Sequence, residues 1–202
     1  AISESTRRRQ RSDVCREATP FGRLVDVLSA PTEDGDTVSI PIQHPLAFLC
    51  IAARECPDFK QLLKDTLARS GNTMRMLIYT DEVTPGQQLN ARNFWKCHGI
   101  YWSIADFPIA TLSCENAWIT MSVVRSNNVE KIDGGLNHLL KLLLHKCFSH
   151  PYDLRQGVYI DLSFDSPILL FGEVYCMVQD LAAHKMSTLC KGHSAHRVCP
   201  LC

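Results

Sequence analysis

The pattern of apolar and polar positions predicts alternating short strands and helices along most of the chain. Residues 45–69 carry apolar side chains at helical spacing, and Pro57 divides them into two helices. Residues 76–80 are a short β-favouring run between turn-forming residues, as expected for a buried strand. This strand is predicted to end at Asp81, since aspartate is a poor strand former.

The second half of the chain continues the alternation. Aromatic and β-branched residues predict antiparallel neighbouring strands at 94–107 and 117–124. An amphipathic helix follows Gly134-Gly135, with leucines at i, i+3, i+4 and i+7 spacing. The remaining expected elements are strands at 157–164 and 168–179 and a helix at 181–189.

The order of these elements predicts an α/β protein containing part of a ribonuclease-H-like fold. The expected arrangement is three antiparallel strands, a crossover helix and a strand parallel to the first. A right-handed crossover places that last strand beside the first or near it. The expected segments are a basic, disordered N-terminal segment (1–40), a small helical segment (41–72), the partial ribonuclease-H-like domain (73–189) and a Cys/His segment (190–202).

Two of the predicted strands are apolar runs that end directly at an aspartate. These aspartates are Asp81 and Asp180. Adjacent parallel strands lie about 4.8 Å apart, so carboxylates at equivalent ends can share a metal ion. Carboxylate oxygens suit Mg²⁺ or Mn²⁺, and two-metal phosphoryl transfer uses such ligands. The alternative is that both residues are merely polar strand terminators.

The C-terminal segment carries a second candidate metal site. Cys199 and Cys202 have the spacing of half a zinc site, because two thiolates so spaced can take adjacent corners of a tetrahedron. Cys190, His193 and His196 are the nearby candidates for the other Zn²⁺ ligands. A redox role for the cysteine pair would need a thioredoxin-like context, which the sequence lacks.

Composition and charge restrict the possible classes of protein. The formal net charge is zero, so any contact with DNA would depend on local patches rather than on the whole molecule. The arginine-rich stretch 7–11 is typical of a solvated tail, or alternatively of a nuclear-import or phosphate-binding patch. No apolar run is long enough to cross a membrane and no secretion signal opens the chain, so we expect a protein that is neither secreted nor membrane-bound.

The positions of four cysteines predict reduced thiols in the core, and the two ends of the chain predict a fragment. Cys50, Cys114, Cys147 and Cys176 lie inside apolar runs and are expected to be reduced core thiols. The chain begins with Ala and ends on the second cysteine of a Cys-x-x-Cys pair, which favours a fragment of a longer protein.

These motifs together resemble the catalytic domain of eukaryotic DDE transposases of the CACTA (En/Spm) type, over roughly residues 74–202. Thr80-Asp81 matches the strand that ends in the family's first catalytic aspartate. Asp180 with Leu181-Ala-Ala matches the second, and Gly192 with Cys199-Pro-Leu-Cys202 matches the glycine and cysteine pair that follow. Glu82 stands where relatives often have glycine, and the family's later His pair and final catalytic Glu have no counterpart here.

The resemblance implies a nuclear DNA transposase or nuclease that binds Mg²⁺ or Mn²⁺ through Asp81 and Asp180. Localisation would be nuclear, or cytoplasmic for an inactive relic. One alternative is a non-catalytic, zinc-stabilised module that binds nucleic acid or protein and derives from the same fold. Another is a self-contained nuclease that uses Asp81, Glu82 and Asp180.

Overall fold

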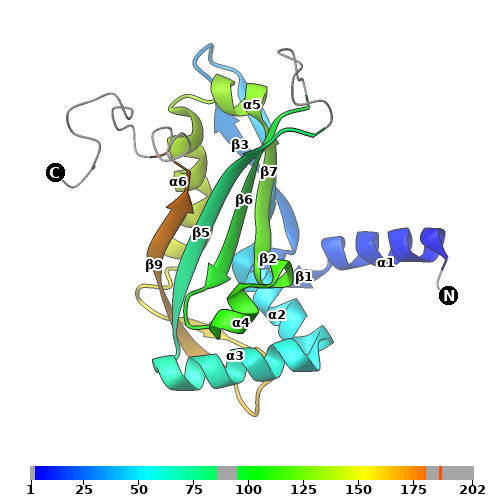
Figure 1. Ribbon diagram of the computed structural model, residues 1–202, viewed down its shortest axis with the longest axis vertical. Helices are drawn as coiled ribbons and strands as arrows, with labels where there is room; N and C mark the ends of the chain where they lie inside the picture. Colours follow the sequence, from blue (N-terminus) through cyan, green and yellow to red (C-terminus); the bar gives the residue numbers. More distant parts are fainter. Residues whose placement is uncertain (1–2, 86–94, 181–186, 188–202) are drawn as a thin grey trace.

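The protein is built on a strongly curled, seven-stranded mixed sheet that forms a half-barrel (Figure 1). The computed structural model describes residues 3–85, 95–180 and Ser187. The strand order is β3-β4-β7-β6-β5-β9-β8. These strands are β3 (Val25–Pro31), β4 (Thr37–Gln43), β5 (Thr73–Val83), β6 (Cys97–Ile104), β7 (Ile119–Arg125), β8 (Val158–Ile160) and β9 (Ile168–Gln179), and β1 (Ala18–Thr19) pairs separately with β2 (Gly22–Arg23).

Proline and glycine set several helix boundaries. Pro45 and Pro57 occupy the first turns of α2 and α3, where a missing N–H costs nothing. Gly71 ends α3 in the left-handed conformation, with φ of 62°. The helices are α1 (Glu4–Arg16), α2 (Pro45–Glu55), α3 (Pro57–Ser70), α4 (Ile109–Leu112), α5 (Ser126–Lys131) and α6 (Gly135–Phe148), with a 3₁₀ turn η1 (Glu115–Ala117).

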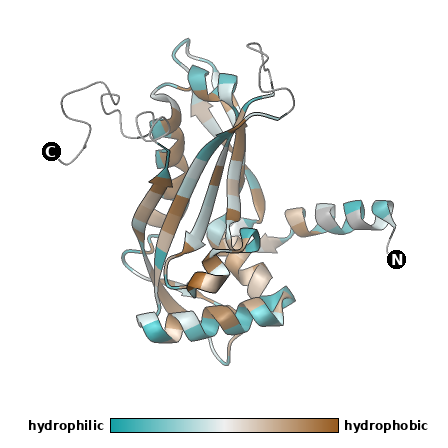
Figure 2. Cartoon of the chain, viewed as in Figure 1, coloured by the Kyte–Doolittle hydropathy of each residue, from teal (hydrophilic) through white to brown (hydrophobic). Residues whose placement is uncertain are grey.

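The core lies on one face of the sheet. Alternate residues of β5 point toward it, and Met74, Met76 and Ile78 are fully buried. Helices α2 and α6 supply the other side of this core, and hydrophobic and hydrophilic residues alternate along the strands (Figure 2). The opposite side of the sheet, which we call the outer face, receives the intervening residues of β5, including Tyr79 and Asp81.

The N-terminal region differs from the expected disorder over residues 1–40. Helix α1 is polar and projects away from the sheet (Figure 1). Strands β3 and β4 form a hairpin that joins the main sheet through the pair Ile42 and Ser122. Ile40 of β4 is fully buried, so the hairpin contributes to the central core. Polar residues on the exposed side of the hairpin conceal this pattern in the sequence.

The predicted alternation of helices and strands from residue 45 to 179 is confirmed, with changed boundaries. Strand β5 continues to Val83, so Asp81 lies inside it rather than at its end. Strand β9 ends at Gln179, directly before Asp180, as predicted. The helix expected at 181–189 lies outside the described residues except for Ser187.

No helix in the described part of the chain has the length and apolar character needed to cross a membrane.

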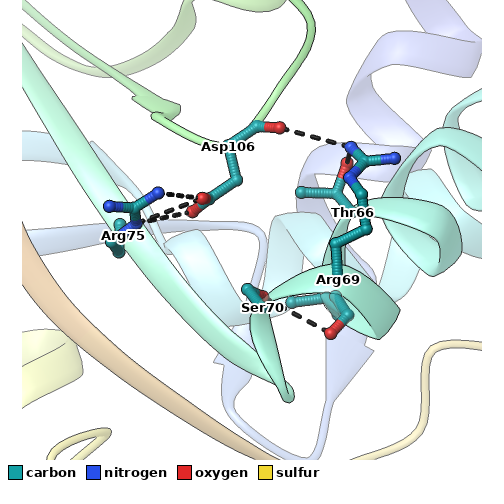
Figure 3. A network of polar contacts seen from close by, with 6 residues as sticks. Thr66, Arg69, Ser70, Arg75 and Asp106 are labelled. Carbon is teal, nitrogen blue, oxygen red and sulfur yellow. Dashed lines mark hydrogen bonds and ion pairs between the residues drawn. The ribbon is translucent and has the colours of Figure 1, made fainter.

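A polar network fastens the first residues of β5 to the turn after β6 (Figure 3). The Arg75 guanidinium donates to both carboxylate oxygens of Asp106, and the Asp106 carboxylate raises the pKa of Arg75. Arg69 of α3 donates to the Asp106 carbonyl oxygen at 3.4 Å. Arg75 also lies over the ring of Tyr175 in β9, 4.8 Å from its centroid. The network therefore joins α3, β5, the β6 turn and β9.

Candidate functional site

The parallel pairing of β5 and β9 brings the two predicted aspartates to neighbouring positions. Tyr79 pairs with Val178 and Thr80 with Gln179. Continuing this register by one residue places Asp180 beside Asp81. Paired residues of parallel strands point to the same face of a sheet, so the register assigns both carboxylates to the outer face.

A β-bulge sets this register. Met76 pairs with Val174 but Leu77 pairs with Cys176, so Tyr175 is an extra residue in β9. If Tyr175 paired regularly with Leu77 and there were no bulge, Asp81 would lie beside Gln179, and Asp180 would fall on the other face. The bulge is therefore the local feature that aligns the two aspartates, and Arg75 packs on the ring of the extra residue.

The hydroxyl of Tyr79 links the aspartates to the aromatic residues of the outer face. It donates to Oδ2 of Asp81 at 3.0 Å. Burial raises the pKa of Tyr79, and the hydrogen bond to Asp81 and the negative charges of Asp81 and Asp180 raise it further. The tyrosine therefore remains a neutral donor that holds one orientation of the Asp81 carboxylate.

On the core side, a chain of hydrogen bonds fixes the ends of the two strands. Gln179 donates from Nε2 to Oγ1 of fully buried Thr80 at 2.7 Å. The Ser187 hydroxyl donates to Oε1 of Gln179 at 2.7 Å, and Asn137 of α6 donates to the Ser187 carbonyl oxygen. These contacts connect the residues that precede Asp81 and Asp180 to the crossover helix.

Glu82 belongs to a different cluster from Asp81. Strand alternation turns it away from the outer face, where it accepts from Ser126 at 2.7 Å and pairs with Lys96 at 3.1 Å. The Ser126 hydrogen bond lowers the pKa of Glu82, and the Lys96 charge lowers it further. His98 lies 3.8 Å from Glu82, and burial lowers the pKa of this imidazole. The geometry therefore disfavours a nuclease that uses Asp81, Glu82 and Asp180 together.

A pocket of about 490 Å³ opens on the outer face next to Asp81. Its walls combine aromatic rings, carboxylates and two valines. Tyr79 lies 6.0 Å from Tyr101 in a stacked arrangement and 5.8 Å from Trp118 in an edge arrangement, measured between ring centroids. The described residues that line the pocket are Tyr79, Asp81, Val83, Tyr101, Glu115, Trp118 and Val178.

Gly99 leaves the space into which the Tyr101 ring folds. It pairs with Asp81 across β5 and β6, and a Cβ built on it would lie 2.6 Å from the Tyr101 hydroxyl oxygen. The absence of a side chain at Gly99 thus lets the Tyr101 ring lie along the strand toward Asp81. This arrangement needs glycine for space rather than for an unusual backbone conformation.

We expect Gly99→Ala to lower the free energy of unfolding by about 1 kcal/mol, because the new methyl group displaces the outer end of the Tyr101 ring and weakens its stacking on Tyr79. In a Tyr101→Ala background the same change should cost less than about 0.5 kcal/mol, since the overlap is gone. Urea denaturation of the four proteins of this cycle measures both values. Equal costs in the two backgrounds would contradict the packing described here.

The predicted zinc site is not tested by the structure. Cys190, His193, His196, Cys199 and Cys202 all lie outside the described residues, so the zinc site stays a prediction. The described part of the chain contains no group of three or more His, Cys, Asp or Glu side chains placed to hold a metal ion.

The expectation of four core thiols is only partly correct. Cys147 is buried and Cys50 is half-buried. Cys114 and Cys176 are exposed, because the first lies between α4 and η1 and the second lies on the outer face of β9.

Sequence reasoning missed Tyr101, Trp118 and Glu115 as neighbours of Asp81. Strand alternation is a signal for Tyr101, because it places Tyr79 and Asp81 on the same face as Gly99 and Tyr101 of the neighbouring strand. Glu115 and Trp118 lie outside the strands, so alternation gives no signal for them. Comparison of the sequence with models of known protein families and with curated proteins finds no match. The site is therefore interpreted from its own geometry.

Proposed function

We propose that the chain is part of a metal-dependent DNA-processing protein of the DDE transposase type, with a ribonuclease-H-like fold. The observation that carries this proposal is the in-register parallel pairing of β5 and β9, which aligns Asp81 with Asp180. The arrangement β7-β6-β5-β9 also supports it, because three antiparallel strands are followed by a parallel strand after helix α6.

The donor set suits one hard divalent cation. Asp81 and Asp180 would supply carboxylate oxygens, and Mg²⁺ commonly binds one or two carboxylates together with water and substrate phosphates. When bound, such an ion polarises a phosphoryl oxygen and lowers the pKa of coordinated water. The contribution of this chain is to align the two carboxylates through the β9 bulge and to orient Asp81 through Tyr79.

Residues at the same end of the outer face support contact with nucleic acid. Arg125 of β7 pairs with Cys97, and its guanidinium lies 4.5 Å from the centroid of the exposed Trp95 ring. Arginine is suited to phosphate contacts, and an exposed indole can stack on a base.

A non-catalytic binding module is the second candidate. It is favoured by the lack of a third carboxylate grouped with Asp81 and Asp180 among the described residues. In this version the fold presents a binding surface, and the C-terminal Cys/His segment adds a zinc ion for stability. Sustained DNA binding without divalent metal, together with zinc that survives mild chelation, would support it.

Titration calorimetry with Mn²⁺ and Mg²⁺ tests the metal-dependent proposal. We expect Asp81→Asn and Asp180→Asn each to weaken binding by more than about tenfold, equivalent to about 1.4 kcal/mol. Glu82→Gln is the matched control and should bind as the wild type does, because Glu82 contacts Ser126 and Lys96 instead. Equal binding by the wild type and Asp180→Asn would overturn the shared site.

A further inference from the structure

The outer-face pocket is lined mainly by aromatic and aliphatic side chains, which a site that only aligned Asp81 and Asp180 would not need. It lies over β5, β6 and β9, and Glu115 of η1 and Trp118 form one of its walls. Its volume of about 490 Å³ is within the range of small-molecule sites. Most of the pocket wall is apolar, and the polar groups are few.

The aromatic walls of the pocket are held in place by specific contacts. Trp118 donates from Nε1 to the Leu112 carbonyl oxygen at 3.0 Å, so its only polar group is already satisfied. Tyr101 folds over Gly99, and Tyr79 is anchored by its hydrogen bond to Asp81. The three rings therefore line the pocket in a preformed arrangement, which reduces the ordering cost of binding.

The charges around the pocket are negative. Asp81 and Glu115 line it, and the Asp180 carboxylate is close enough to act on the Tyr79 hydroxyl. Among the described residues that line the pocket there is no Lys, Arg or His. An anion entering this space would be repelled, whereas a cation would be attracted by the carboxylates and by the ring faces.

We propose that this pocket binds the methylated or quaternary ammonium group of a small ligand or a modified side chain. A methylated ammonium is weakly hydrated and presents an apolar surface, so it suits a wall made mainly of aromatic and aliphatic carbon. A primary ammonium is more strongly hydrated and would lose more hydration in the same place. The site goes beyond the proposed function, although it shares Asp81 with it.

Choline and its neutral isostere 3,3-dimethyl-1-butanol provide a direct test without metal or DNA. We expect the full chain to bind choline at least about tenfold more tightly than the neutral alcohol in calorimetry, since only the cation gains from the rings and carboxylates. Equal affinity for the two compounds would overturn the proposal.

Two variants locate the site. Trp118→Leu and Glu115→Gln should each weaken choline binding by at least about threefold. Tyr159→Leu, which changes an exposed aromatic residue of β8 outside the pocket, should leave it unchanged. Glu115 is exposed, so its variant keeps the test valid even if Trp118→Leu fails to fold. Unchanged binding by a folded Glu115→Gln protein would contradict the assigned site.

A second comparison identifies the source of the ammonium group. Binding of a trimethyl-lysine peptide, but not of its unmodified lysine counterpart, would indicate a modified protein side chain. Tighter binding of choline than of the trimethyl-lysine peptide would indicate a small metabolite. Absence of binding by both choline and the peptide would overturn the inference while leaving the Mn²⁺ result for Asp81 and Asp180 unaffected.

Discussion

Replacing Trp102 by alanine is expected to lower the free energy of unfolding by about 3–5 kcal/mol. Trp102 is fully buried in β6, and its ring meets Phe48 of α2 edge-on with centroids 6.1 Å apart. Its removal would leave a cavity between the sheet and α2, because neighbouring side chains close such a space only partly. Urea denaturation of the purified chain measures the difference.

Two control substitutions, one at Trp102 and one at Trp95, test whether the loss of stability comes from the packing of the Trp102 ring. Trp102→Phe should cost less than Trp102→Ala, since it keeps a ring against Phe48 and removes a buried Nε1 group that has no hydrogen-bond partner. Trp95→Ala should cost no more than about 1 kcal/mol, because that ring is 65% exposed and contacts Arg125 by a cation–π interaction. Similar losses at positions 95 and 102 would show that the core is not organised around Trp102.

The stability of the fold should fall as the pH decreases from 6.5 toward 4, and His44 should be a main cause. Burial lowers the pKa of His44 from 6.5 to about 4, and the nearby Lys146 charge lowers it while Asp26 opposes this. The unfolded chain therefore binds a proton in this window that the folded chain does not, so folding is favoured above pH 6.5 and penalised below it. The difference of about 2.5 pKa units corresponds to about 3 kcal/mol.

His44→Phe tests this assignment. The ring would keep its place near Phe21 and Tyr152, and a buried Nδ1 atom without a partner would be removed. Denaturation at pH 7 and pH 4.5 should show a smaller pH effect in the variant than in the wild type, with a remainder from His98, whose pKa burial also lowers. The exposed His145→Phe variant is the matched control, and it should keep the wild-type dependence.

Much of the fold follows from local signals in the sequence. Pro45, Pro57 and Gly71 mark the ends of α2 and α3, and the leucine spacing identifies the buried face of α6. The parallel placement of β9 beside β5 follows from the crossover between them. By contrast, the β3–β4 hairpin was missed, because its short strands carry exposed polar residues and two prolines, which weaken the β pattern.

The candidate site was less accessible to sequence reasoning. Asp81 and Asp180 could be selected as carboxylates at the ends of apolar runs, but their alignment depends on the β-bulge that leaves Tyr175 unpaired. A one-residue bulge has no reliable sequence signal, since it depends on tertiary pairing. The aromatic residues of the strands give no sequence signal for the face that they occupy, because hydrophobicity alone does not say which face of a curled sheet is covered. Trp102 is fully buried in the core, whereas Tyr79 and Tyr101 are half-buried on the outer face.

The pairing of β5 with β9 also has a consequence for the order of folding. Strands β5, β6 and β7 are linked by neighbouring antiparallel pairs, whereas Thr73 and Phe171 are separated by roughly a hundred residues of chain. Closing so long a loop is entropically costly, and non-local parallel pairing forms slowly. During synthesis the three-stranded unit can form before β9 has been made. The two aspartates meet only when this last strand docks, so a nascent chain lacks the site until the sheet is nearly complete.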